Sequence, residues 1–103
     1  MENLKGVFGS ENECVYIVED GDTLRSIAEN FSTTEHLIIE DNFLKNQIKT
    51  GDKLYIKTYQ KIYIVTPYDT LNGIALKFGV TTQSLLETNK ILYIYAGERI
   101  VIP

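Results

Sequence analysis

The side chains that most often carry out chemistry in proteins are scarce in this sequence. There is one histidine, His36, and one cysteine, Cys14. No second histidine, cysteine or paired acidic ligand stands at helical spacing from His36, so we interpret it as a solvated surface residue. A single cysteine excludes an internal disulfide framework, and we interpret Cys14 as a partly buried free thiol, with an intermolecular disulfide as the alternative. We predict no metal site and no cofactor.

The acidic side chains do not form a recognisable catalytic pair. Glu40, Asp41 and Asp52 are scattered as solvated charges usually are. Two carboxylates are enough to cleave a glycosidic bond, but a shallow groove on a small module gives little exclusion of water. The sequence also has no P-loop and no glycine-rich dinucleotide turn. We therefore predict that the chain is not an enzyme.

Charge and hydropathy exclude further classes of partner. The 103 residues include 10 Lys and Arg against 14 Asp and Glu, a net charge of −4. An acidic chain is a poor partner for phosphate backbones and for anionic membranes, so we expect no nucleic acid and no membrane partner. No apolar run approaches the roughly 18 residues of a membrane span. The first residues lack the pattern of a signal peptide, which suggests cytoplasmic synthesis or an excised fragment.

An internal repeat organises most of the chain. Residues 16–42 align with residues 63–89 without a gap, and 12 of these 27 positions are identical. One residue is then lost in the second copy, after which GDKLYI (51–56) matches GERIVI (97–102). We divide the chain into an N-terminal segment (1–14) that is a candidate for flexibility, a first module (15–57), a linker (58–61) and a second module (62–103).

Each copy is predicted to form a strand, two helices and a second strand. Residues 15–18 are β-branched and aromatic, and Asp22 or Thr23 can cap a following helix. Thr34 and Thr81 are candidate caps of a second helix, which should stop near Asn42 and Asn89 because asparagine tolerates the left-handed cap conformation. The first helix of each copy has one apolar stripe, which should face a core: Leu24, Ile27, Ala28 and Phe31, and Leu71, Ile74, Ala75 and Phe78.

These residues resemble the LysM pattern, which runs Tyr-x-Val, Gly-Asp-Thr-Leu-x-x-Ile-Ala-x-x-Phe, Asn, and Ile-x-x-Gly-x-x-Leu-x-Ile. The resemblance covers residues 15–103 and occurs twice in the right order. It implies an α+β fold of two tandem βααβ modules, each a two-stranded antiparallel sheet with two helices on one face. It also implies a non-catalytic module that binds glycans containing N-acetylglucosamine, of the peptidoglycan or chitin type, as in a bacterial cell wall or spore envelope.

In that family the sugar lies in a shallow groove between two loops, which gives candidate glycan-binding residues. One wall is the turn after the first strand with the start of the first helix, and the other is the loop before the last strand. In copy one these positions are Gly21, Asp22, Thr23, Leu24 and Arg25, and Phe43, Leu44, Lys45 and Ile48. In copy two they are Tyr68, Asp69, Thr70, Leu71 and Asn72, and Ile91, Leu92, Tyr93, Ile94 and Tyr95.

Copy two departs from the pattern at its first turn. Tyr68 replaces the usual glycine, and a turn that required positive φ there would strain a tyrosine, so we expect the turn to have changed shape. Two interpretations follow. Tyr68, Tyr93 and Tyr95 form an aromatic platform for a sugar ring, or copy two is degenerate and only structural.

Strand alternation predicts apolar outer sheet faces, with Val15, Ile17 and Tyr55 in copy one and Ile62, Ile64 and Val101 in copy two. We hypothesise that these faces are covered, by each other or in a homodimer, whereas scattered surface hydrophobics are the alternative. The apolar outer faces favour a second functional hypothesis. In it, the chain is a protein-interaction module that assembles a bacterial spore or cell envelope layer, with weak or no glycan binding.

Overall fold

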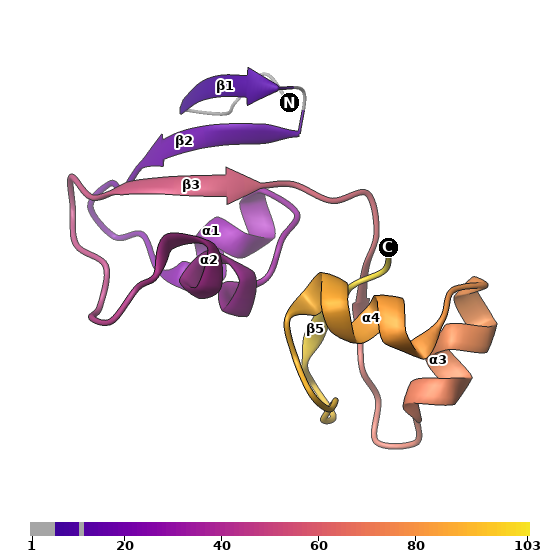
Figure 1. Ribbon diagram of the computed structural model, residues 1–103. Helices are drawn as coiled ribbons and strands as arrows, with labels where there is room; N and C mark the ends of the chain where they lie inside the picture. The colour runs from indigo at the N-terminus through magenta and orange to yellow at the C-terminus, as the bar shows by residue number, and fades with distance from the viewer. Residues whose placement is uncertain (1–5, 11) are drawn as a thin grey trace. The chain divides into compact units, whose positions relative to one another are not determined.

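The structure is a computed structural model that describes residues 6–10 and 12–103, and it contains two compact units (Figure 1). The first unit is Met1–Tyr59 and the second is Gln60–Pro103. Each is an α+β unit in which two short helices cover one face of a small antiparallel sheet, as the sequence predicts. No helix among the described residues is long and apolar enough to cross a membrane.

The sheet of the first unit has three strands. The predicted pair is present as β2 (Glu13–Ile17) and β3 (Lys53–Lys57), with Tyr16 opposite Leu54. A further strand, β1 (Gly6–Ser10), pairs antiparallel with the other edge of β2 (Figure 1). The repeat leaves these residues outside the first module and predicts two strands. This sheet is therefore one strand wider than expected.

The helices of the first unit begin where threonine side chains cap them. In α1 (Leu24–Asn30) the Thr23 hydroxyl accepts from the Ser26 N–H at 3.0 Å, and the Ser26 hydroxyl accepts from the Thr23 N–H at 3.0 Å. This reciprocal pair satisfies two donors that the first helical turn would otherwise leave unbonded. In α2 (Glu35–Asn42) the Thr34 hydroxyl accepts from the Leu37 N–H at 3.1 Å. Of the two candidates Asp22 and Thr23, the cap is Thr23, and the prediction of Thr34 as a cap is confirmed.

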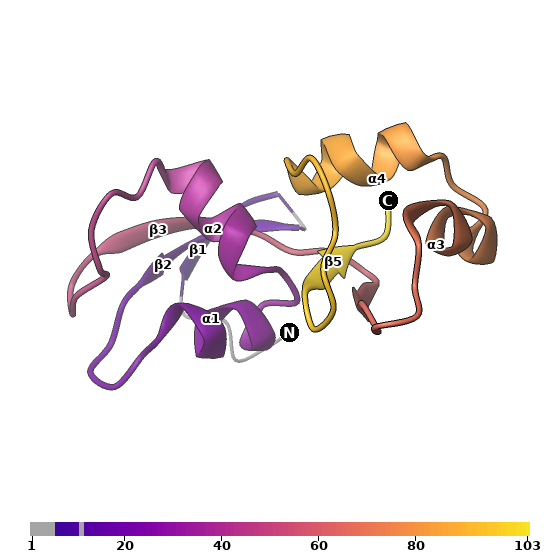
Figure 2. The ribbon, with the colours of Figure 1, turned by 90° about the horizontal axis from the view of Figure 1, so that it is seen from below.

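The core of the first unit lies between the helices and one face of the sheet (Figure 2). The rings of Tyr16 and Phe31 meet edge to face with centroids 5.0 Å apart. On the opposite face of the sheet, Val15, Ile17 and Tyr55 are each about two-fifths exposed, as strand alternation predicts. The buried cluster consists of Cys14, Tyr16, Val18, Ile27, Ala28, Phe31, Ile38, Leu54 and Ile56.

The second unit repeats this plan with two strands only. Its elements are β4 (Ile62–Ile64), α3 (Leu71–Phe78), α4 (Thr82–Asn89) and β5 (Arg99–Val101). Thr70 and Thr81 cap the two helices, so the prediction for Thr81 is confirmed. The rings of Tyr63 and Phe78 pack edge to face, with their centroids 5.3 Å apart. The buried cluster consists of Val65, Ile74, Ala75, Leu85, Ile100 and Ile102.

The residues assigned to the outer face of this second sheet differ in exposure. Ile64 is 57% exposed, whereas Val101 is fully buried. Val101 lies outside the cluster formed by its neighbours Ile100 and Ile102. The side-chain amide of Asn89 is hydrogen-bonded to both backbone groups of Val101, at the edge of β5. Of the residues assigned to this outer face, Val101 is therefore covered, whereas Ile64 is not.

The segment predicted as a linker, 58–61, is hydrogen-bonded at both ends. The N–H groups of Thr58 and Tyr59 donate to the carbonyls of Asn12 and Ser32 within the first unit, each at 2.9 Å. The Lys61 carbonyl accepts from the Ile102 N–H at 3.0 Å within the second unit.

Candidate functional site

The turn that follows the opening strand of the first unit is organised by one carboxylate. Asp22 Oδ2 accepts a hydrogen bond from the Tyr16 hydroxyl at 2.5 Å and another from the Glu19 N–H at 2.7 Å. The Asp22 N–H closes the turn on the Glu19 carbonyl at 3.1 Å. Gly21 has φ of +86°, a conformation that glycine adopts without a steric penalty. Asp22 thus fixes the shape of the predicted glycan-binding turn from its inner side.

The same carboxylate anchor recurs in the second unit although the turn has changed. Asp69 Oδ2 accepts from the Tyr63 hydroxyl at 2.6 Å and from the Thr66 N–H at 2.8 Å, and these bonds lower the pKa of Asp69. Among the described residues, the non-glycine residues with positive φ are Ser32, Phe43 and Lys90, so Tyr68 does not copy the conformation of Gly21. The expected change of shape is present. It leaves the Tyr68 side chain 94% exposed.

The loop that forms the opposite predicted wall also ends in a tight turn. Gly51 has φ of +95°, and the Asp52 N–H bonds the Lys49 carbonyl at 3.0 Å. The Thr50 hydroxyl then donates to the Asp20 carboxylate at 3.2 Å, which joins the two walls of the first unit directly. The aligned residues of the second unit are Ala96 and Pro67, which cannot make this bond. The two walls are therefore cross-linked by side chains at this point in the first unit alone.

Several of the predicted site residues hold the walls to the core and do not point outward. They are the apolar residues of both walls, and each is partly buried against the core of its own unit. In the first unit these are Leu24, Leu44 and Ile48, and in the second unit Leu71, Ile91 and Ile94. Both walls of a unit are therefore anchored to the same core.

A second group of predicted residues is exposed and available for contact. Arg25 pairs with Glu29 at 3.5 Å in solvent. The large exposed apolar side chains of these loops are Phe43 (85%), Tyr68 (94%), Leu92 (88%), Tyr93 (72%) and Tyr95 (61%). Lys45 and Asn72 are exposed as well. The predicted residues of the first unit include two exposed cations and one exposed ring, whereas those of the second unit are richer in aromatic residues.

The residues that end the second helices differ from the expectation. Asn42 and Asn89 were expected to adopt the left-handed cap conformation, but Phe43 (φ 53°) and Lys90 (φ 55°) adopt it. The asparagines stay helical because their amides bond the closing strand. Asn42 accepts from the Tyr55 N–H at 2.7 Å and donates to its carbonyl at 2.8 Å. A left-handed conformation is unusual for an exposed phenylalanine and directs Phe43 into solvent.

Comparison with known proteins identifies the family. The LysM domain model matches residues 16–57 and residues 63–103. The chain belongs to the LysM family. LysM domains in general bind glycans that contain N-acetylglucosamine, and they are binding modules without catalytic machinery. A search of curated proteins found no match.

Solved structures that resemble this LysM chain cover most of its length. The spore cortex-lytic enzyme SleL of Bacillus megaterium QM B1551 is 32% identical over 86% of this chain, with a TM-score of 0.46. SleL of Bacillus cereus is 26% identical over 89% of this chain, with a TM-score of 0.44. The LYK3 ectodomain is 22% identical over 93% of this chain and 58% of its own, with a TM-score of 0.40. This chain spans 22% and 23% of the two SleL chains.

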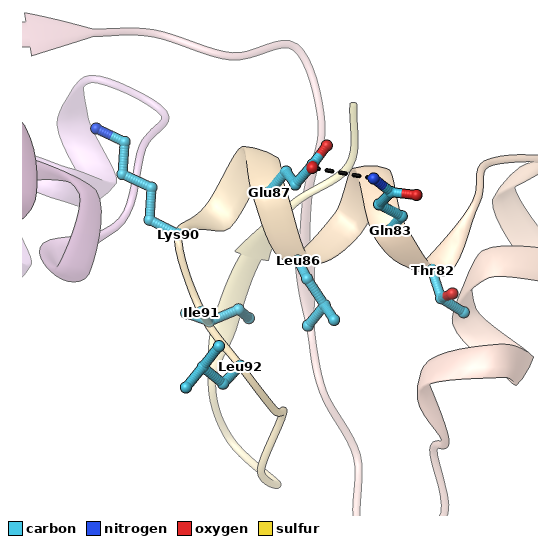
Figure 3. A pocket seen from close by; sticks show the side chains of 7 residues that line it. All are labelled: Thr82, Gln83, Leu86, Glu87, Lys90, Ile91 and Leu92. Carbon is cyan, nitrogen blue, oxygen red and sulfur yellow. Dashed lines mark hydrogen bonds between the residues drawn. The ribbon is translucent and has the colours of Figure 1, made fainter.

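An open apolar pocket lies on the second LysM unit, beside the predicted groove wall. Its volume is about 520 Å³, and seven residues from α4 and the following loop line it. Figure 3 shows Leu86, Ile91 and Leu92 gathered on one side of the helix, with Lys90 directed away. A hydrogen bond of 3.1 Å between Gln83 and Glu87 borders it. Ile91 and Leu92 are among the predicted glycan-binding residues. The α4 residues of the pocket are not, because their spacing in the sequence is that of any half-exposed helix face.

Proposed function

We propose that this LysM chain is a non-catalytic carbohydrate-binding protein for glycans that contain N-acetylglucosamine, of the peptidoglycan or chitin type, in a bacterial cell wall or spore envelope. The observation that carries the proposal is the match of both units to the LysM domain. A glycan groove between the two loops of each unit, built from the residues predicted above, is the binding site in this proposal.

The chemistry of the loops suits an acetamido sugar. Turn N–H groups and carbonyls can bond the N-acetyl amide, and exposed rings can cover the apolar face of a sugar. In the first unit Phe43 supplies the ring and Arg25 supplies a flanking donor. The bond between Thr50 and Asp20 holds the two walls in one arrangement before any ligand arrives, which lowers the entropy cost of binding. We infer that the first unit is the stronger binder.

The second unit would bind through its aromatic residues. Tyr68, Tyr93 and Tyr95 are 61–94% exposed, which no packing role explains. We favour the aromatic-platform interpretation over a purely structural second copy for this reason. Its walls lack the Thr50–Asp20 bond, so we expect weaker binding than in the first unit.

The test is an NMR titration of the full chain with N-acetylglucosamine oligomers of increasing length. We expect shifts at residues 21–25 and 43–48 that grow with oligomer length, and smaller ones at 68–72. Phe43→Ala should weaken binding about threefold to tenfold, the range that aromatic contacts of about 0.5–1.5 kcal/mol give. Leu76→Ala is the matched control, because Leu76 is equally exposed (83%) but lies on α3 away from both walls.

The outcome that would overturn glycan binding is the absence of shifts at either groove up to millimolar oligomer. Binding that persists in the chain with Phe43→Ala and Tyr68→Ala combined would place the site elsewhere. The second candidate function, assembly of an envelope layer, would then be favoured. The observation that supports it is the exposed apolar surface outside the grooves, at Ile17, Ile64 and Leu76.

A further inference from the structure

The two LysM units differ in what covers the outer edge of the opening strand. In the first unit this edge belongs to β2, and β1 pairs with it, with Val7 opposite Val15. The second unit has the strand order β4–β5, so no strand among residues 6–10 and 12–103 pairs with the equivalent edge of β4. Unpaired strand edges are templates for pairing with another chain unless charges, prolines or bulges protect them.

The register shows which backbone groups face this edge. The Ile102 N–H donates to the Lys61 carbonyl and the Val65 N–H donates to the Glu98 carbonyl. Hydrogen-bonded positions alternate along an antiparallel pair. Tyr63 therefore bonds β5, while the N–H and C=O groups of Ile62 and Ile64 point away from it. Ile62 is the counterpart of Val15, which lies opposite Val7 of β1 in the first unit.

We propose that a second copy of this chain covers the free edge, by antiparallel pairing of β4 with the second copy's β4. A two-fold axis through Tyr63 places Ile62 opposite the second copy's Ile64, and the reverse. Each such pair exchanges backbone hydrogen bonds in both directions and brings two β-branched side chains together on the outer face. The surface is self-complementary, as a closed dimer interface must be.

Charge and sequence favour a second copy at this edge. Residues 60–103 contain four basic and three acidic side chains, whereas residues 1–59 contain six basic and eleven acidic ones. The second unit therefore meets a copy of itself with little net repulsion. The nearest strand charge, Lys61, would lie opposite the second copy's Val65, so no like charges face each other across the pairing. The side chain of Ile64 is 57% exposed, which leaves it free to pair.

The test is the average molecular mass of the full chain by sedimentation equilibrium over a range of concentrations. We expect the mass to rise with concentration from 11.7 kDa towards twice that value. Two double variants then separate the proposed pairing from any other. Ile62→Lys with Ile64→Lys puts like charges opposite each other and should weaken association about tenfold or more. Ile62→Lys with Ile64→Glu puts opposite charges face to face and should retain it, although both variants remove the same apolar surface.

Amide hydrogen exchange gives a second readout that loss of folding would not imitate. The amides of Ile62 and Ile64 should become protected as concentration rises, while the Tyr63 amide, bonded to β5, should be protected throughout. A chain that stays monomeric at millimolar concentration overturns the proposal. So does a dimer whose mass is the same in both double variants, or a mixed complex in which an extended segment of another protein, and not a second copy, protects these two amides.

Discussion

The side-chain amide of Asn89 pairs with Val101 as the backbone of a neighbouring strand would. Its Oδ1 accepts from the Val101 N–H at 2.7 Å, and its Nδ2 donates to the Val101 carbonyl at 2.8 Å. Nδ2 also donates to the Leu85 carbonyl at 2.8 Å, within α4. Asn42 makes the same set of bonds to Tyr55 and Ile38 in the first unit. In each unit one asparagine thus joins the second helix to the closing strand, at the edge of that strand that faces away from the opening strand.

Replacing these asparagines should destabilise each unit separately. Asn89→Ala leaves the buried N–H and carbonyl of Val101 without partners, at a cost of about 1–3 kcal/mol for each unsatisfied group. Asn42→Ala should cost less, because Asn42 is only half-buried. Unit-resolved hydrogen exchange in urea measures both. Asn30→Ala is the control, since Asn30 is exposed at the end of α1; an equal loss there would contradict the assigned role.

Lowering the pH should decrease the free energy of unfolding of the second unit, because Asp69 becomes protonated. Hydrogen bonds from Tyr63 and Thr66 lower the pKa of Asp69, so folding favours its charged form. This contribution is fully present above the unfolded carboxyl pKa, near 4, and is lost as pH falls through the lower folded value. Asp69→Asn should remove that part of the acid dependence, measured as amide protection of Ile74 and Ala75. Glu29→Gln, an exposed carboxylate in the first unit, should leave it unchanged.

The Tyr55 phenol should titrate late in alkali. Its hydroxyl donates to Glu13 Oε1 at 2.7 Å, and this bond with partial burial raises the pKa of Tyr55 to about 12. The protonated phenol is favoured in the folded state, so its contribution is present below pH 10 and is lost as pH rises towards 12. Glu13→Gln should lower the pKa of Tyr55, as read by NMR of the labelled ring. An unchanged value would show that Glu13 is not the principal cause.

Two lysines should stabilise the second unit through aromatic faces. Lys77 Nζ lies 5.0 Å from the Tyr63 ring centroid and 5.6 Å from that of Phe78, and Lys61 Nζ lies 5.1 Å from the Phe78 centroid. Exposed contacts of this kind contribute about 0.5–1 kcal/mol. Lys77→Met keeps the apolar stem and removes the charge, so it should cost that amount in urea unfolding. Lys53→Met, which changes an exposed lysine of the first unit, should leave the unfolding of the second unit unchanged.

A glycine in each closing turn should be replaceable only at a cost in strain. Gly97 has φ of +89°, and a Cβ added there would meet nothing within 4 Å. Gly97→Ala therefore tests the backbone alone and should lower the free energy of unfolding by roughly 1–2 kcal/mol. Gly97→Asn should recover part of the loss, because asparagine tolerates positive φ better. If alanine and asparagine were equally damaging, a steric contact in place of backbone strain would be responsible.

The repeat explains why so much of the fold could be predicted. Positions such as Thr34 and Thr81, or Phe31 and Phe78, occur twice in the same setting, so one error would have appeared as a mismatch between copies. β1 has no counterpart in the second copy, and nothing local in GVFGS separates a strand from an extended tail. It becomes a strand only because the edge of β2 is available to it, which is a tertiary effect.

The candidate site was predicted less completely, for two physical reasons. The roles of Asp22 and Asp69 depend on Tyr16 and Tyr63, six residues earlier, which is a contact that spacing alone does not indicate. Phe43 and Lys90 adopt the left-handed conformation because Asn42 and Asn89 are hydrogen-bonded to the closing strands. The family pattern named two loops in each unit, and their role in glycan binding stays a prediction. It did not separate the residues that pack on the core, such as Ile48, from those that reach solvent, such as Phe43.

The asparagine amides also set a limit on how far such a sheet can grow. A strand added beside β4 finds free backbone groups, but one approaching β5 finds those of Val101 already taken by Asn89. In a pair of chains joined through β4, the two outermost strands would both be β5, and in each of them Asn89 occupies the backbone groups of Val101. The proposed pairing through β4 would therefore give a four-stranded sheet that ends at β5 on both sides.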